Sequence, residues 1–274
     1  MALEMQEASK NLESVTVITV VKNHTIGLLK TIESLKSQVF KEWNSIIVVG
    51  ASKDSTLTRA QEFAQADSRI TVIVQEDSGI YEAMNIGINQ SKSNFLWFMN
   101  SGDTFMDTKS LGHGVEMLSK SKYGFVVGGY KIANQPKVYS QSTTRITPLT
   151  FAFTRRGGCH QAMVFRRSSL LENGLFDTKF RLAADYDLCL KILKTSGAEK
   201  SSEVYAVMEP NGRTDNSLLE MHREKLSIRR NLFGKSIWLR PLSWAWMYLA
   251  LTKSRFKTWI CKLRRVAFFL EPTE

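Results

Sequence analysis

The sequence predicts an α/β protein with a mostly parallel sheet that carries helices on both faces. β-Branched apolar runs of strand length alternate with segments that repeat apolar residues at helical spacing. Of its 274 residues, 43% are hydrophobic and 23% are charged, which is typical of a globular protein with a buried core. Strands that alternate with helices in this way form βαβ units, whose strands run parallel.

Four strands and three helices account for the first hundred residues. The clearest strand is the run Val15-Thr-Val-Ile-Thr-Val-Val21, which is apolar along its length, as a strand buried on both faces must be. The helix after it has apolar residues at Ile26, Leu29, Ile32 and Leu35. We expect strands over 15–21, 45–49, 70–74 and 95–98, and helices over 26–38, 57–66 and 80–91.

Beyond residue 103 the alternation is less regular. We expect helices over 109–119 and 182–195 and strands over 125–130 and 204–208, with an edge or antiparallel strand over 138–144. From Leu218 onward the sequence is helical and basic. The sequence therefore predicts three regions: a lead-in over 1–14, one α/β domain over 15–216, and a helical, basic and aromatic extension over 217–274.

Targeting and redox features are few. Residues 1–14 have no apolar core, so we do not expect a secretory signal. No run of about 18 apolar residues occurs, which argues against a membrane-spanning helix. The three cysteines, Cys159, Cys189 and Cys261, are odd in number and far apart, so we expect free thiols in a reducing compartment rather than disulfides or a zinc site.

The net charge of +11 is concentrated in the extension. There, Lys and Arg alternate with Trp, Tyr and Phe, a composition that suits the interface of an anionic membrane. The alternative is that the extension packs on the body or on another subunit. No recognition motif accompanies the charge, so we expect no nucleic-acid partner.

Ligands of such a sheet bind outside the carboxyl ends of its strands. The loops at those ends are polar or contain glycine, and together they predict a nucleotide site. They are 22–23, 50–54, 77–81 and 100–103.

The sharpest chemical signal is the segment Phe95-Leu-Trp-Phe-Met-Asn-Ser-Gly-Asp103. Asp103 follows directly on an apolar strand, where a divalent cation could join its carboxylate to a diphosphate. Such a cation offsets the charge that develops on a leaving diphosphate. The alternative is that Asp103 caps the helix near Asp107.

A second signal is the segment from Glu76 to Ile88. Gly79 allows a positive φ or a close approach of the backbone, and the helix after it directs its first N–H groups toward that loop. Asn85 lies one turn after Tyr81 on the same helical face. The alternative is an ordinary capped helix.

The third signal combines Cys159-His160-Gln161 with Ala184-Asp185-Tyr186-Asp187. Asp185 and Asp187 are two residues apart at a helix start, so their side chains point in different directions. One can face a cleft and accept a proton from a sugar hydroxyl, while the other stays at the helix N-terminus. The alternative is that both acids cap the helix and that His160 is structural.

Together these segments resemble family 2 glycosyltransferases of the GT-A fold, and in particular the bacterial branch that builds colanic acid, O-antigen and capsule. The resemblance covers about residues 14–210. The motifs that carry it, in chain order, are Thr19-Val-Val-Lys-Asn23, Gly50-Ala-Ser-Lys-Asp54, the run from Asp77 to Ile88, Asn100-Ser-Gly-Asp103, Cys159-His-Gln161 and Ala184-Asp-Tyr-Asp187.

The resemblance implies a role for each matching residue. Asp103 matches the metal-binding acid, Asp185 the general base, and His160 with Gln161 a loop near the acceptor and the leaving group. It also divides the domain into a nucleotide-sugar half (15–103) and an acceptor half (104–216). The residues expected to contact the donor are Thr19, Val21, Asn23, Asp54, Asp77, Gly79, Asn85, Asn100, Ser101 and Gly102.

Three positions depart from the family pattern. Val49 stands where the family usually has an acid that reads the nucleotide base, and Lys22 where many members have an aromatic residue that stacks on the base. Base recognition would then fall to backbone groups, to Asp54, or to a different nucleotide. Lys191 stands where an arginine often follows the general base Asp185. A lysine cannot form the two parallel hydrogen bonds to a phosphate that an arginine forms.

The expected function is inverting transfer of a hexose from a nucleotide sugar, with a UDP-sugar favoured, to a glycan acceptor that is lipid-linked. The expected cofactor is Mn²⁺ or Mg²⁺, and the expected location is the cytoplasmic face of the inner membrane, in surface polysaccharide synthesis. The alternatives are a degenerate scaffold or glycan-binding protein, and a nucleotidyltransferase.

Overall fold

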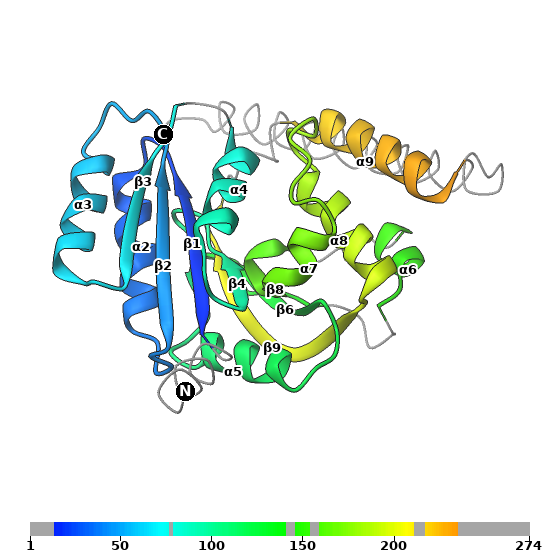
Figure 1. Cartoon of the computed structure of the whole chain (residues 1–274), viewed down its shortest axis with the longest axis horizontal. Coiled ribbons are helices and arrows are strands. Elements are labelled where there is room, and N and C mark those ends of the chain that lie inside the picture. The colour runs from blue at the N-terminus through cyan, green and yellow to red at the C-terminus, as the bar shows by residue number, and fades with distance from the viewer. Residues whose placement is uncertain (1–13, 77–78, 141–145, 154–158, 211–216, 235–274) are drawn as a thin grey trace, which may run out of the picture. The chain divides into compact units, whose positions relative to one another are not determined.

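The computed structural model describes residues 14–76, 79–140, 146–153, 159–210 and 217–234 (Figure 1). The chain divides into two compact units, residues 1–212 and residues 213–274. The described part of the first unit is an α/β fold built on one sheet, and the predicted fold class is confirmed.

The sheet has nine strands in the order β3-β2-β1-β4-β8-β6-β9-β5, and β7 pairs with β6. Strands β3, β2, β1 and β4 run parallel to one another, and β6 and β9 run parallel to each other. β8 lies antiparallel between β4 and β6, and β5 pairs antiparallel with β9. The strands are β1 (Val15–Val21), β2 (Trp43–Val49), β3 (Ile70–Val74), β4 (Phe95–Phe98), β5 (Thr104–Phe105), β6 (Phe125–Ile132), β7 (Val138–Tyr139), β8 (Met163–Arg166) and β9 (Ala198–Met208).

Helices cover the parallel half of the sheet on both faces (Figure 1). Because successive side chains of a strand point to opposite faces, Val15, Val17 and Val21 of β1 join the core cluster that contains α2. Ile18 points the other way and packs against Gly87 of α4. The helices are α2 (Thr25–Lys36), α3 (Thr56–Ala66), α4 (Ile80–Gln90), α5 (Ser110–Ser119), α6 (Pro148–Phe153), α7 (Arg167–Glu172), α8 (Ala184–Thr195) and α9 (Leu218–Phe233).

The first half follows the sequence closely. β1, β3 and β4 have the predicted bounds, and β2 and helices α2, α3 and α4 differ from the predicted ranges by a few residues at their ends. In the second half, β9 begins at Ala198, well before the predicted start, and β7 covers only Val138–Tyr139 of the strand expected over 138–144, of which residues 141–145 lie outside the described residues.

The elements that the sequence did not predict join the two halves of the sheet. β8 is only four residues long, yet it pairs with β4 on one side and β6 on the other. β5 is a two-residue strand on β9. Short helices α6 and α7 and the 3₁₀ turn η1 (His160–Ala162) were also missed. Segments this short hold too few residues to show a periodicity.

The side chain of Trp97 is the centre of the core where the two halves meet. It is fully buried, and it makes edge-on aromatic contacts with Phe105 of β5 and Tyr205 of β9. Its indole Nε1 donates a hydrogen bond of 2.8 Å to the backbone oxygen of Gln161. One side chain of β4 therefore anchors β5, β9 and η1.

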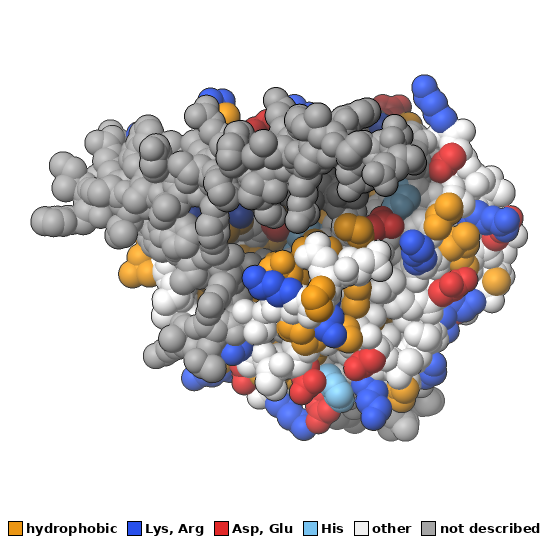
Figure 2. Space-filling view, turned by 180° about the vertical axis from the view of Figure 1, so that it is seen from behind, with side chains coloured by type: hydrophobic (Ala, Val, Ile, Leu, Met, Phe, Trp, Pro, Cys, Tyr) orange, Lys and Arg blue, Asp and Glu red, His pale blue; other side chains and the backbone are white. Residues whose placement is uncertain are grey.

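In the second unit the structure describes α9, a helix with acidic, basic and apolar residues. The rest of the predicted basic extension, residues 235–274, lies outside the described residues. No helix in the described ranges combines the length and the hydropathy of a membrane span. Figure 2 shows acidic and basic side chains interspersed over one face of the described surface.

Gly87 gives a test of the packing between α4 and β1. A Cβ there would lie 2.6 Å from Cγ2 of Ile18. Overpacking of this kind costs about 1–3 kcal/mol, which exceeds the gain of about 1 kcal/mol in helix propensity. We expect Gly87→Ala to lower the free energy of unfolding in urea. In an Ile18→Ala background the same substitution should cost less, and an equal cost in both backgrounds would contradict this packing.

Candidate active site

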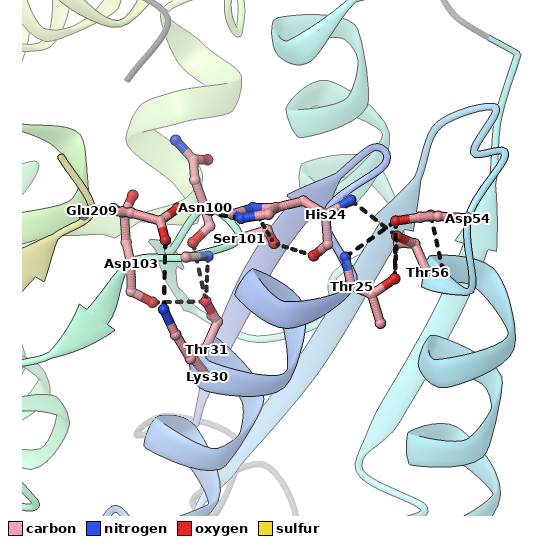
Figure 3. Close-up of polar contacts among 11 residues, drawn as sticks. His24, Thr25, Lys30, Thr31, Asp54, Thr56, Asn100, Ser101, Asp103 and Glu209 are labelled. Atoms are coloured by element: carbon pink, nitrogen blue, oxygen red, sulfur yellow. Dashed lines mark hydrogen bonds and ion pairs between the residues drawn. The ribbon is translucent and has the colours of Figure 1, made fainter. Parts of the chain in front are cut away.

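The loops after β1, β2 and β4 lie together at one edge of the sheet. β1 and β2 end in register, because Val21 pairs with Val49. β4 ends earlier, with Phe98 beside Ile18 of β1, and its chain continues along β1 through a hydrogen bond from Ser101 N to Val20 O. The segment 100–103 therefore lies beside the loop 22–25 (Figure 3).

The carboxylate of Asp54 anchors the first two of these loops to each other. Its Oδ2 accepts a hydrogen bond of 2.9 Å from Thr25 Oγ1, and its Oδ1 accepts one of 3.1 Å from Thr56 N (Figure 3). Hydrogen bonds, first of all from Thr56, lower the pKa of Asp54 to about 2. The Asn23 side chain adds to this connection by accepting from Lys53 N at 2.7 Å. Asp54 thus holds the starts of α2 and α3.

The side chain of Val49, at the end of β2, lies in the core. Val49 is 1% exposed and belongs to the core cluster, because strand alternation turns its side chain toward α2 and α3. The residue at the strand exit is Gly50, and an added Cβ there would contact the aliphatic part of Lys22 at 3.5–3.7 Å. The buried side chain of Val49 gives a nucleotide base no polar contact, and Lys22 is the exposed side chain beside this strand end.

Asp103 lies inside the protein behind this edge. It is 6% exposed, its Oδ2 accepts from Gln161 Nε2 at 2.8 Å, and its Oδ1 accepts from Glu209 N at 2.8 Å. Burial raises the pKa of Asp103, and these two hydrogen bonds oppose that rise. Asp107, not Asp103, makes the cap-like contacts at the start of α5, where it accepts from Lys109 N and Ser110 Oγ.

The turn that carries Asp103 is held by Thr31 of α2. Its hydroxyl donates to the backbone oxygen of Asp103 at 2.7 Å and accepts from Gly102 N at 3.0 Å (Figure 3). Gly102 has a φ of +98°, which favours glycine. Its missing side chain also leaves room for Glu209 and His24.

His24 and Glu209 form an ion-pairing cluster in front of Gly102 that sequence reasoning missed. His24 Nε2 lies 3.3 Å from Glu209 Oε2, and Lys30 Nζ lies 3.7 Å from Glu209 Oε1 (Figure 3). Glu209 is more than a hundred residues from the motif that it joins, and it follows a strand whose pairing with β5 was not predicted. No local pattern marks either residue.

The side chain of Asp185 is the centre of a second network. Its Oδ1 accepts from Tyr81 Oη at 3.1 Å and from Tyr186 N at 2.8 Å, and its Oδ2 lies 3.0 Å from His160 Nδ1. The carboxylate only accepts, so Nδ1 carries a proton, and His160 Nε2 can accept from Asn100 Nδ2 at 3.2 Å. Asn100 Oδ1 is buried, and no residue in the described ranges bonds to it.

The two acids of α8 have separate partners. Asp187 is 4% exposed, and its carboxylate forms an ion pair of 2.7 Å with Lys191 Nζ one turn later in α8. The side chain of Asp185 is 25% exposed and that of His160 is 13% exposed. Asp185 is therefore the acid of this pair that solvent can reach.

Several predicted donor residues have other partners in the structure. The Asn85 amide bonds both to Phe176 O at 2.9 Å and to Phe176 N at 3.0 Å, so it fixes the loop before α8. Thr19 and Val21 are buried within β1. Gly79 precedes α4 with a φ of 107°, as expected of a glycine there, and Asp77 lies outside the described residues.

The family model for glycosyl transferase family 2 matches residues 16–175. The chain belongs to this family. A PGL/p-HBAD biosynthesis glycosyltransferase of Mycobacterium bovis is 24% identical over 177 residues, which is 64% of this chain and 68% of the relative. An uncharacterized glycosyltransferase of Mycobacterium tuberculosis is 28% identical over 188 residues, covering 65% of this chain and 68% of the relative.

Solved structures share the fold of this family 2 member. Staphylococcus aureus TarS 1-349 aligns with a TM-score of 0.64 and 18% identity over 80% of this chain, and the match spans 66% of that chain. The mannosyltransferase PcManGT from Pyrobaculum calidifontis, in complex with GDP-Man and Mn²⁺, aligns with a TM-score of 0.60 and 16% identity, covering 97% of this chain and 88% of that one. These two matches show a shared fold.

The side chains at this edge fit a divalent cation that also binds a diphosphate. No group of three or more His, Cys, Asp or Glu side chains gathers for a metal within the described ranges. Cations that bind substrate phosphates take only one or two carboxylates from the protein. Glu209 supplies a carboxylate here, and its Oε2 occupies the room that the missing side chain of Gly102 leaves, with the buried carboxylate of Asp103 bonded to Glu209 N behind it.

The anchoring role of Asp54 predicts a pH dependence of stability. Its folded pKa of about 2 lies below the ordinary value of 3.8, so its contribution is present above pH 3.8 and is lost as the pH falls through 2. Asp54→Ala should therefore lower the free energy of unfolding at pH 7 and have little effect near pH 2. Urea unfolding across this range measures the difference, and a difference independent of pH would contradict the role.

Proposed function

We propose that this family 2 member is an inverting glycosyltransferase that moves a sugar from a nucleotide-sugar donor to a glycan acceptor. The observation that carries the proposal is the accessible carboxylate of Asp185, held by Tyr81, Tyr186 and His160 beside the segment 100–103. A fixed, partly exposed carboxylate next to the strand exits of an α/β sheet is suited to act as a general base.

The reaction is one in-line displacement. An acceptor hydroxyl oxygen bonds to the anomeric carbon, the bond from that carbon to the diphosphate oxygen breaks, and its electron pair leaves with the diphosphate. Asp185 takes the proton from the attacking hydroxyl. The three hydrogen bonds to Asp185 hold its carboxylate in one orientation, and fixed orientation of reacting groups lowers the barrier.

His160 and Asn100 act as positioning residues in this proposal. The His160 ring lies between Asp185 Oδ2 and the Asn100 amide, so it couples the proposed base to the turn that carries Asp103. Asn100, Ser101 and Gly102 line the donor side of the site. Gln161, expected beside the acceptor, instead supports Asp103 from behind.

A divalent cation, when bound, offsets the charge of the leaving diphosphate. The residue that would hold it is Glu209 on the donor side, with His24 beside it. Asp103, the residue expected to bind the metal, belongs to this group as a supporting residue in our proposal, because both of its carboxylate oxygens accept hydrogen bonds inside the protein.

We propose a UDP-sugar as donor and a lipid-linked glycan as acceptor, in bacterial surface polysaccharide synthesis such as that of colanic acid, O-antigen or capsule. TarS 1-349 has been solved with UDP-GlcNAc, and the structure of PcManGT contains GDP-Man. For the body of this chain we propose a cytoplasmic location, peripheral on the inner membrane face. We retain residues 15–216 as its catalytic domain, with 217–274 as the attachment region.

The first experiment is a calorimetric screen of UDP-, GDP- and dTDP-sugars with and without Mn²⁺. We then expect Asp185→Asn to lower transfer of the bound donor at least about 100-fold, because the amide cannot take the acceptor proton. Donor affinity should stay within about twofold, since Asp185 lies on the acceptor side.

The matched control for this prediction is Asp177→Asn, which changes an acid paired with Lys179 outside the network. It should transfer at the wild-type rate. Substantial transfer by Asp185→Asn would contradict its role as the base, and failure of every donor to bind the folded protein would contradict the proposed function.

The membrane proposal is tested on α9, where Arg223 and Arg230 are exposed and seven residues apart, on one side of the helix. We expect the full chain with both changed to Glu to bind vesicles of anionic lipid more weakly than wild type, because each basic residue near such a surface contributes about 1 kcal/mol. Sedimentation with vesicles measures the change. Equal binding by the two proteins would exclude this helix from the contact.

A further inference from the structure

We propose that His24 Nε2 and Glu209 Oε2 are the protein ligands that contact the divalent cation, and that Asp103 acts behind them by holding Glu209. The substrate in this inference is taken from the proposed function. The distances and contacts that support the two ligands do not depend on that function. All three residues lie together at the edge of the sheet where the loops after β1, β2 and β4 meet (Figure 3).

The first argument is the spacing of the two ligand atoms. His24 Nε2 and Glu209 Oε2 are 3.3 Å apart. Two atoms that each lie about 2.1 Å from one octahedral ion, at right angles to each other, are about 3 Å apart. The observed separation is therefore close to that of two neighbouring ligands of one cation.

The second argument is the hydrogen bonding of the His24 ring. Ser101 Oγ lies 3.3 Å from the backbone oxygen of His24 and 3.2 Å from its ring Nδ1. A carbonyl oxygen only accepts, so the hydroxyl donates to it and accepts from Nδ1–H. In the neutral ring the Nε2 lone pair then faces Glu209, and this is the arrangement that metal-binding histidines require.

Two acceptors that face each other at 3.3 Å repel unless a positive group lies between them. A divalent cation provides it when donor is bound. Lys30 Nζ approaches the other oxygen of Glu209, Oε1, and leaves Oε2 to the cation.

The third argument is that two glycines make room for this pair. A Cβ on Gly27 would overlap the His24 ring, and a Cβ on Gly102 would overlap Glu209 Oε2 and lie 3.0 Å from His24 Cε1. The two glycines are joined by a hydrogen bond of 3.1 Å from Gly102 N to Gly27 O. The imidazole therefore lies where the missing side chains of Gly27 and Gly102 leave room for it.

Strand pairing places Glu209 opposite Gly102. Thr104 of β5 pairs with Val207 of β9 in an antiparallel ladder, and two further residues along that register bring Glu209 to Gly102. The hydrogen bond from Glu209 N to Asp103 Oδ1 holds this arrangement. Both oxygens of Asp103 accept hydrogen bonds inside the protein, whereas the side chains of His24 and Glu209 are 40% and 35% exposed.

The ligand chemistry also indicates which ion binds. Mg²⁺ prefers oxygen ligands, whereas an imidazole nitrogen suits transition metals. A site with one nitrogen and one carboxylate oxygen, completed by diphosphate oxygens and water, therefore favours Mn²⁺ over Mg²⁺.

The test is Mn²⁺ binding to the full-length protein, followed by electron paramagnetic resonance, with Mn²⁺ alone and with Mn²⁺ plus UDP. We expect the bound ion to show coupling to an imidazole ¹⁴N nucleus. His24→Gln should abolish that coupling and weaken Mn²⁺ binding at least about tenfold. Glu209→Gln should weaken binding similarly while the ¹⁴N coupling of the remaining bound ion persists.

The matched controls are His113→Gln and Glu62→Gln, which change exposed residues of α5 and α3. Both should bind Mn²⁺ as wild type does. Gly102→Ala should lower Mn²⁺ affinity with His24 and Glu209 both still present, because its Cβ displaces the carboxylate, and circular dichroism checks that the variant is folded.

The outcomes separate this inference from the proposed function. Mn²⁺-dependent UDP binding that lacks ¹⁴N coupling and is unchanged in His24→Gln would overturn the ligand assignment and leave the transferase intact. Coupling to His24 with Mn²⁺ alone would support the assignment, even if no nucleotide sugar bound and the proposed function failed.

Discussion

The buried carboxylate of Asp103 joins three segments that are far apart in the sequence. It lies in the turn after β4, it accepts from Gln161 of η1, and it accepts from the backbone of Glu209 after β9. Desolvating a carboxylate is costly unless donors compensate it, so this pair of hydrogen bonds holds both partner segments against the turn. The donor side of the site depends on this arrangement, because Glu209 reaches Gly102 only while β9 is held there.

Three aspartates at one edge of the sheet have different roles because their surroundings differ. Asp54 is exposed and bonded to the starts of two helices, which lowers its pKa. Asp103 is buried, which raises its pKa. Asp185 is partly exposed and is bonded to side chains that leave part of it open to solvent. A carboxylate that is both held and accessible is the one suited to receive a proton from a substrate.

The first half of the fold could be predicted because its strands are long and buried on both faces. β1 has seven apolar or β-branched residues in succession, and α2 repeats its apolar residues over three turns. The junction with the second half could not be predicted, since β8 has four residues and β5 has two. Aromatic packing buries them, since Phe105 of β5 contacts Trp97 and Phe165 of β8 contacts Phe98 and Phe125, which is a tertiary effect.

The sequence by itself determined the fold class, the edge of the sheet at which the polar loops lie, and the pair of acids, Asp185 and Asp187, at the start of one helix. These follow from periodicity and from motifs within single segments. Only the tertiary structure decided that Val49 faces the core, that Asn85 holds Phe176, and that Glu209 meets His24 across Gly102. The physical reason is that side-chain direction and long-range strand pairing depend on how the whole core packs, and no local pattern records them.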